Sequence, residues 1–166
     1  MSLGLTIPVG ILVAREIIDH SWPATRWRVA GLLLDPPAEA HWRKVAGFSD
    51  APRYHAATLP LSLVAKDVAC YQVNLSNGVP SVYVVSRDHG QQGGAPLTIR
   101  HVSASPFEVR SLAVEGLDSV ESVPMPERLL VTVASFIREA CSIEIAAHSV
   151  WPRRGDMVVP DRRVAE

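Results

Sequence analysis

One stretch of the sequence decides the fold: Leu63-Val-Ala-Lys-Asp-Val-Ala-Cys-Tyr-Gln-Val-Asn-Leu75, then Ser76-Asn-Gly78, then Val79-Pro-Ser-Val-Tyr-Val-Val-Ser-Arg87. In its first part, Val64, Val68, Tyr71 and Leu75 recur at the spacing of one helix face. Asn77-Gly78 follows at the place where a helix often ends in a left-handed residue. The pattern therefore predicts a helix over residues 63–75, capped by Asn77-Gly78.

The last part of this stretch has the composition of a buried strand. The run from Val82 to Val85 is β-branched and aromatic, is too short for a helix and is apolar on both faces. We expect a central strand here. A helix next to a central strand, with further strands expected on both sides, predicts the α+β class.

Upstream, the pattern predicts mainly strands. Residues 7–18 are rich in β-branched side chains and residues 26–34 become wholly apolar, which indicates an antiparallel hairpin. Residues 36–52 show no sustained period, so we expect a covering loop there, with a short helix at Ala38–Lys44. Residues 54–63 are predicted to form an edge strand, because Pro60 cannot donate a ladder hydrogen bond.

Downstream, strands and helices are expected to alternate. Three glycines between Asp88 and Pro96 predict a mobile loop, and residues 97–103 form a strand that leads into a capping box at Ser105 and Glu108. The helix after this box should reach about Glu115, with a short strand at residues 120–123. A final helix opens at Pro126 and carries a wide apolar stripe up to about residue 142.

Taken together, these elements predict a single α+β domain over residues 1–145. We expect a largely antiparallel sheet of five or six strands backed by three helices, and a C-terminal tail over residues 146–166 that is flexible or held by a partner. A chain of 166 residues is long enough to bury a core of ordinary size.

Charge and cysteine content restrict the class of function. The chain has 16 basic and 17 acidic residues, so it lacks the strongly basic balance of a nucleic-acid-binding domain. The apolar N-terminus is interrupted by Pro8 and Gly10 and is too short to span a membrane. Cys70 and Cys141 are expected to be reduced and unpaired. These features predict a cytoplasmic protein without nucleic-acid or membrane-spanning function.

No residue set has the spacing of a catalytic, cofactor or metal site. His101, Ser103 and Ser105 alternate on a strand that enters a helix, but the glycines of a nucleophile elbow are absent, so Ser105 is interpreted as a helix cap. Asp88-His89 could transfer a proton or bind a metal, but no second ligand has suitable spacing. Gly93-Gly94 lacks the lysine of a phosphate loop. We therefore predict no cofactor.

Tryptophans beside basic side chains are the best candidates for recognition of another protein. These residue types contribute most of the binding energy at protein interfaces. The candidate interaction residues are Trp22, Trp27, Arg28, Trp42, Arg87, His89, Trp151, Arg153 and Arg154.

Several short motifs, taken in order, resemble a known family. They are Ile7-Pro-Val-Gly-Ile-Leu-Val-Ala-Arg-Glu16 with Trp22, Trp27-Arg-Val-Ala30, Tyr54-His55 with Thr58-Leu-Pro-Leu61, Tyr71 with Asn74-Leu75, Pro80-Ser-Val-Tyr-Val-Val85 with Arg87, Ser103-Ala-Ser-Pro-Phe-Glu108 and Val123-Pro-Met-Pro126. The chain thereby resembles the family called domain of unknown function 3305 over about residues 8–136. Its departures from the family pattern, at Lys66-Asp-Val-Ala-Cys70 and Val131-Thr-Val133, affect the prediction of a partner surface more than that of the fold.

The resemblance implies a partner and carries over no catalytic residue. Genes of that family typically lie beside those for formate dehydrogenase and molybdenum-cofactor maturation. The expected function is a non-catalytic accessory protein or subunit of a molybdenum- or tungsten-containing formate dehydrogenase. Two alternatives stay open: a small enzyme or binding protein for molybdopterin or nucleotide with the 88–96 loop as a lid, and a self-associating module that forms a homodimer through its tryptophans.

Overall fold

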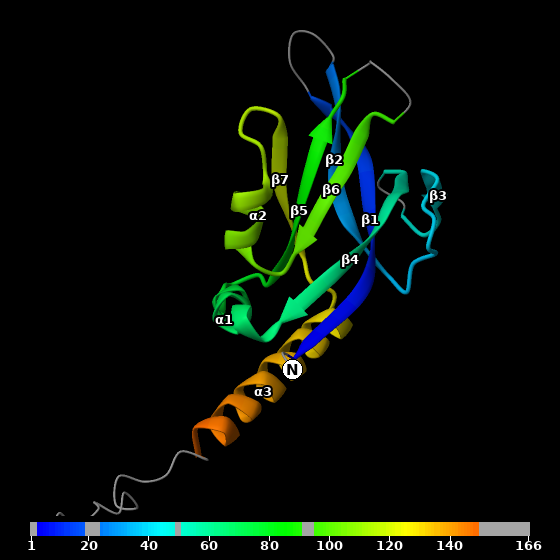
Figure 1. The fold of residues 1–166 in the computed structure, drawn as a ribbon. Coiled ribbons are helices and arrows are strands. Elements are labelled where there is room, and N and C mark those ends of the chain that lie inside the picture. The colour runs from blue at the N-terminus through cyan, green and yellow to red at the C-terminus, as the bar shows by residue number, and fades with distance from the viewer. Residues whose placement is uncertain (1–2, 19–23, 49–50, 91–94, 150–166) are drawn as a thin grey trace, which may run out of the picture.

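The computed structural model describes residues 3–18, 24–48, 51–90 and 95–149. Seven strands lie within these ranges: β1 (Gly4–Ile18), β2 (Ala24–Leu34), β3 (Arg43–Val45), β4 (Arg53–Val64), β5 (Ser81–Asp88), β6 (Leu97–Ser103) and β7 (Asp118–Pro124). Three α-helices accompany them: α1 (Val68–Ser76), α2 (Pro106–Leu112) and α3 (Glu127–Ser149), with a 3₁₀ turn, η1 (Ala65–Asp67), before α1. Figure 1 shows the strands stacked above α3. The predicted α+β class is confirmed.

The strands form two antiparallel sheets, whereas the sequence predicted one sheet of five or six strands. The first sheet has the order β2-β1-β4-β3 and the second has the order β6-β5-β7. The two sheets contact each other in two places, where β4 lies against β6 and where β2 lies against β7. At the second contact the Val29 amide donates to a Glu121 carboxylate oxygen at 3.2 Å. Buried side chains of both sheets, among them Ile11, Leu61, Val82 and Val84, form one core between them. The predicted number of strands was too low, because local sequence patterns do not show how many strands pack around one core.

The first sheet confirms the predicted hairpin and corrects the segment after it. Strands β1 and β2 pair antiparallel with Val13 opposite Val29. The short helix expected at Ala38–Lys44 is absent, and Arg43–Val45 forms β3 instead. Strand β3 pairs with β4 only at residues Arg53–His55. Pro60 lies outside this pairing, which fits a residue that has no amide proton to donate.

The second sheet has β5 at its centre, as its apolar composition predicts. Val82, Val84 and Val85 are all buried, and β6 and β7 flank the strand. On β6 a bulge shifts the register between Val85 and Ser86 of its partner. A bulge moves the following residues to the other face of the strand. Val102 therefore joins Leu97 in the core, whereas strict alternation without the bulge would place the two side chains on opposite faces.

For residues 63–87 the prediction of a helix followed by a strand is confirmed, but the predicted boundaries of the helix are wrong. Strand β4 runs through Val64, and the α-helix begins only at Val68, after the 3₁₀ turn. The predicted left-handed cap is also wrong, because Asn77 leaves the helix in an extended conformation with φ −68° and ψ 155°. The side chain of Asn74 connects the end of the helix to the strand that follows. Its amide donates to the carbonyls of Ser81 and Ala104 at 2.7 and 2.8 Å, and its oxygen accepts from the Ser81 amide at 3.0 Å, which ties α1 to the start of β5.

Helix α2 starts where the capping box predicts but ends early. Ser105 Oγ accepts from the Glu108 amide at 3.3 Å. A capping box also predicts that the Ser105 amide donates to the Glu108 carboxylate. That prediction is wrong, because the Ser105 amide donates to Ser103 Oγ at 2.9 Å and that hydroxyl donates to the Glu108 carboxylate. The helix stops at Leu112 because the Val114 amide donates to Asp118 Oδ2 at 2.8 Å instead of continuing the helical ladder.

The close packing around Gly10 of β1 leads to a prediction about stability. A Cβ on Gly10 would lie 2.9 Å from His55 Nε2, 2.9 Å from Pro36 Cβ and 3.0 Å from Leu33 Cβ. Overpacking of this kind typically costs about 1–3 kcal/mol, so Gly10→Ala should lower the thermal midpoint clearly. Gly4→Ala is the matched control, because its Cβ would meet only the Leu63 carbonyl at an ordinary 3.6 Å. Equal melting of the two variants would refute this packing.

Candidate functional site

The C-terminal part of α3 projects away from the sheets. Its first part is anchored, with Leu129, Val133, Phe136 and Ala140 buried against the core. From Ser142 to His148 every residue is exposed, and Figure 1 shows this end of the helix beyond the rest of the fold. The helix reaches Ser149, past residue 142, where the sequence pattern weakens. Most of the stability of a helix in a protein comes from packing, so this exposed helical end is a surface that a partner could cover.

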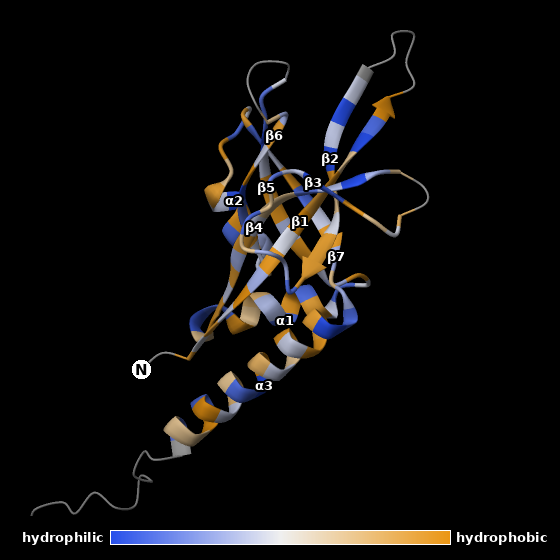
Figure 2. Ribbon diagram, turned by 90° about the vertical axis from the view of Figure 1, so that its right-hand side faces the viewer, coloured by the Kyte–Doolittle hydropathy of each residue, from blue (hydrophilic) through white to orange (hydrophobic). Residues whose placement is uncertain are grey.

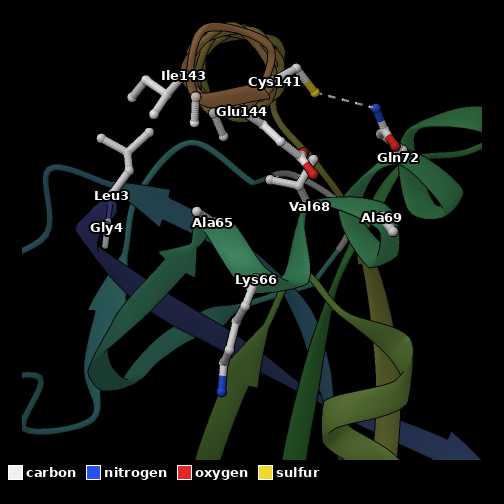
Figure 3. A pocket seen from close by; sticks show the side chains of 12 residues that line it. Leu3, Gly4, Ala65, Lys66, Val68, Ala69, Gln72, Cys141, Ile143 and Glu144 are labelled. Carbon is white, nitrogen blue, oxygen red and sulfur yellow. Dashed lines mark hydrogen bonds between the residues drawn. The ribbon is translucent and has the colours of Figure 1, made fainter. Parts of the chain in front are cut away.

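A groove of about 860 Å³ separates this helical end from the N-terminus, η1 and α1. Its walls are mostly apolar, and Figure 3 shows Ile143 of α3 on the side of Leu3 and Cys141 of α3 pointing toward Gln72. Ile143 is 51% exposed. The groove is lined by Leu3, Gly4, Ala65, Lys66, Val68, Ala69, Gln72, Ala140, Cys141, Ile143, Glu144 and Ala147.

Polar groups at the groove are few and do not converge. Gln72 Nε2 lies 3.8 Å from Cys141 Sγ, across the gap between α1 and α3. In Figure 3 the Lys66 side chain points away from α3, while Glu144 extends from α3 toward Val68. This arrangement suits an apolar segment better than a charged small molecule.

A second hollow, which we call the aromatic cleft, brings two of the predicted recognition residues together. It encloses about 560 Å³ between Trp27, His41, Trp42, Tyr54, Ala95 and Pro96. The Trp27 ring stands edge-on to both neighbours, 5.2 Å from Trp42 and 5.6 Å from Tyr54 between centroids. Strand register explains the contact of Trp27 with Tyr54, because Trp27 on β2 and Tyr54 on β4 flank neighbouring positions of β1, Arg15 and Val13.

The backbone that carries Trp42 is strained. His41 and Trp42 both have φ of 50°, in the left-handed region that residues with a Cβ rarely adopt. Such a conformation costs about 1–2 kcal/mol per residue. Strain of this kind persists where the surrounding structure holds a side chain in place for function, and here it brings the indole of Trp42 against Trp27.

The other candidate interaction residues that the structure describes, Arg28, Arg87 and His89, each contact a neighbouring polar side chain. Arg28 on β2 pairs with Glu16 at 3.2 Å and with Glu121 at 3.8 Å. His89 Nε2 lies 2.7 Å from Thr98 Oγ1. Trp22, Trp151, Arg153 and Arg154 lie outside the described residues, as do positions 91–94 of the predicted loop.

Arg87 takes part in a compact ion cluster. Its Nε donates to Asp118 Oδ1 at 2.8 Å, and Arg100 donates to Oδ2 at 2.8 Å. The Asp118 side chain has no solvent exposure. The Arg87 guanidinium and the Val114 amide hold the pKa of Asp118 at about 2, so the carboxylate stays charged and locks β5, β6 and β7 together.

His101 and Ser103, which the sequence analysis considered as part of a catalytic site, do lie close together. Their arrangement does not suit nucleophilic attack. Glu108 lies between the two other groups: Ser103 Oγ donates to its carboxylate, and His101 Nε2 lies 3.5 Å from the same group. A triad needs the histidine next to the serine. Ser103 and Ser105 are also buried, so both serines fix the start of α2.

A buried histidine beneath the 36–37 segment, His55, has a lowered pKa. The Thr58 hydroxyl donates to the Pro37 carbonyl at 2.6 Å, and therefore accepts from His55 Nε2 at 2.9 Å. Burial lowers the pKa of His55, with a smaller contribution from the charge of Arg43. The native state thus favours the neutral imidazole.

This pKa shift predicts acid sensitivity. Because the folded pKa lies below the unfolded value of about 6.5, the unfolded state binds the proton first, and stability should fall as pH drops below about 6.5. His55→Gln should be less stable at neutral pH and should lose part of this pH dependence, measured by thermal melting between pH 7.5 and 5. His148→Gln, at an exposed histidine, should melt with the wild-type pH profile. An unchanged slope in His55→Gln would exclude His55 as the cause.

Sequence reasoning missed the groove and saw only part of the cleft. The groove joins residues 3–4, 65–72 and 140–147, and only the tertiary fold brings them together. A usable signal was present in α3, where Ile143 and Ile145 continue beyond the regular stripe and are exposed. The sequence did not indicate Tyr54 as a recognition residue, because its place beside Trp27 depends on strand register.

The described part of the chain holds no group of three metal-ligating side chains. None of its helices is long and apolar enough to cross a membrane. Cys70 and Cys141 are both unpaired, as predicted.

Comparison with known proteins gives one family and no nearer relative. No curated protein and no solved structure was found to match the chain. A family model described as protein of unknown function (DUF3305) matches residues 8–146. The match covers most of the sequence, including every strand except the first few residues of β1, both short helices and the larger part of α3. The chain therefore belongs to the DUF3305 family.

Proposed function

We propose that the protein is a non-catalytic accessory protein or subunit that binds a molybdenum- or tungsten-containing formate dehydrogenase during assembly, maturation or complex formation. The family resemblance supplies this partner as an expectation, and the exposed surface of α3 supports the proposed binding mode. The observation that carries the proposal is the exposed helical end, Ser142–His148, beside an apolar groove. An apolar segment of a dehydrogenase subunit or maturation factor fits such a groove.

The composition of the groove supports protein contact. Leu3, Val68 and Ile143 offer apolar side chains from three separate segments of the chain, and the small residues Ala65, Ala69 and Ala147 leave room between them. Figure 2 shows hydrophobic residues recurring along α3 out to its far end. Burying this surface would release water from apolar groups, which is the main driving force of protein association.

Co-purification from cells that express the dehydrogenase tests the proposal. The affinity tag belongs at the C-terminus, because Leu3 and Gly4 line the groove and an N-terminal tag would obstruct it. We expect dehydrogenase subunits or their maturation factors in the eluate, and reduced formate oxidation in a strain that lacks this protein. Recovery of none of these proteins, together with full formate oxidation in the deletion strain, would refute the proposal.

A further inference from the structure

The aromatic cleft has no part in the proposed contact at α3. We propose that it is a second binding site, which takes an extended, proline-containing segment of a partner protein that also carries acidic side chains. This inference concerns a separate surface and does not depend on the identity of the partner at α3.

The shape of the cleft suits proline. Trp27 and Trp42 stand at an interplanar angle of 88°, and Trp27 and Tyr54 stand at 72°. Nearly perpendicular rings form a corner whose walls are aromatic faces and edges. Proline-rich segments bind in aromatic-lined grooves because their extended helix is already formed and loses little entropy on binding.

The charge at the rim indicates the sign of the ligand. Arg15 lies opposite Trp27 in the pairing of β1 and β2, and Lys44 lies opposite Tyr54 in the pairing of β3 and β4. Residues directly opposite in antiparallel strands project from the same face of the sheet. Both cations are exposed, and neither forms an ion pair with another described residue.

The acidic side chain of the turn that carries Trp42 already has a partner. Glu39 lies 2.6 Å from His41 Nε2, and this pair belongs to the same turn that carries Trp42. Arg15 and Lys44 are thus left to attract carboxylates of a ligand. The two left-handed residues, His41 and Trp42, fix the corner before the ligand arrives.

Tryptophan fluorescence of the full-length protein provides the first test. The probe is a synthetic peptide of three Glu-Pro-Pro repeats, with matched Lys-Pro-Pro and Glu-Gly-Gly peptides as controls. We expect a saturable change in fluorescence with the Glu-Pro-Pro peptide and with neither control peptide. The Trp42→Phe variant should keep the fold and lose most of this fluorescence change. No saturable change, or equal binding of either control peptide, would overturn the proposal.

Carbodiimide cross-linking locates the contact, because the chain has only two lysines, Lys44 and Lys66. A bound acidic peptide should couple to Lys44 and leave Lys66, which lies at the α3 groove, unmodified. Lys44→Glu should weaken binding about fivefold, as expected for reversing one exposed charge pair, and Lys66→Glu should leave it unchanged. Equal coupling of both lysines, or equal binding by both variants, would contradict a site at the cleft.

Discussion

Asn74→Ala is expected to destabilise the protein by about 3–5 kcal/mol, because it leaves three backbone groups unpaired. Asn74 has no solvent exposure, and its side-chain carboxamide forms two hydrogen bonds with the backbone of Ser81 and one with the backbone of Ala104. Each buried polar group left without a partner typically costs about 1–3 kcal/mol. A domain is usually stable by only 5–15 kcal/mol, so the variant should be folded weakly or not at all at 37 °C. Urea denaturation of both proteins measures the difference.

Asn77→Ala is the matched control for this prediction. Asn77 lies three residues further on and is exposed, so its loss should change stability by less than about 0.5 kcal/mol. Loss of less than about 1 kcal/mol in Asn74→Ala would mean that this side chain does not hold α1 to the second sheet. The same bonds support function, since α1 supplies Val68, Ala69 and Gln72 to the groove.

Ile143→Glu should lower affinity for the partner at least thirtyfold, about 2 kcal/mol, and leave stability unchanged. The side chain lines the groove and is half exposed, so the substitution removes apolar contact from the interface and adds a charge there. Within the isolated protein the glutamate remains in water on a helix surface, where substitutions cost little. Recovery of partner by tagged wild-type and variant proteins, compared at equal bait concentration, measures the effect.

The chain offers a close control for Ile143. Ile145 lies on the same helix, is 70% exposed and does not line the groove. Ile145→Glu therefore adds the same charge to the same helical end, and should retain the partner. Equal loss by both variants would mean that the whole end of α3, and not the groove, makes the contact.

Local pattern predicted elements better than it predicted their assembly. The β1–β2 hairpin, the central position of Val82–Val85 and the strand over residues 97–103 follow from composition and spacing, because burial of one or both faces dictates which side chains alternate. The division into two sheets did not follow, because it depends on which distant strands pair. β3 was missed because three residues are too few to show a period.

The candidate surfaces show the same limit. Trp27 and Trp42 were predicted as recognition residues from their residue type, but their contact depends on a left-handed turn at His41 and Trp42. Neither turn residue is a glycine, so the sequence gives no signal for this turn. Asn74 looked like a polar position on a helix, and only the tertiary structure shows that it bonds to Ser81 and Ala104. Polar residues with several buried partners are the hardest to recognise from spacing alone.

The most direct test of the central claim uses purified components. The protein and its proposed partner, an isolated formate dehydrogenase, are mixed and separated by size-exclusion chromatography. The account predicts that the two elute together, and that Ile143→Glu elutes apart from the dehydrogenase while Ile145→Glu still joins it. Separate elution of the wild-type protein from the dehydrogenase and from its maturation factors would contradict the account.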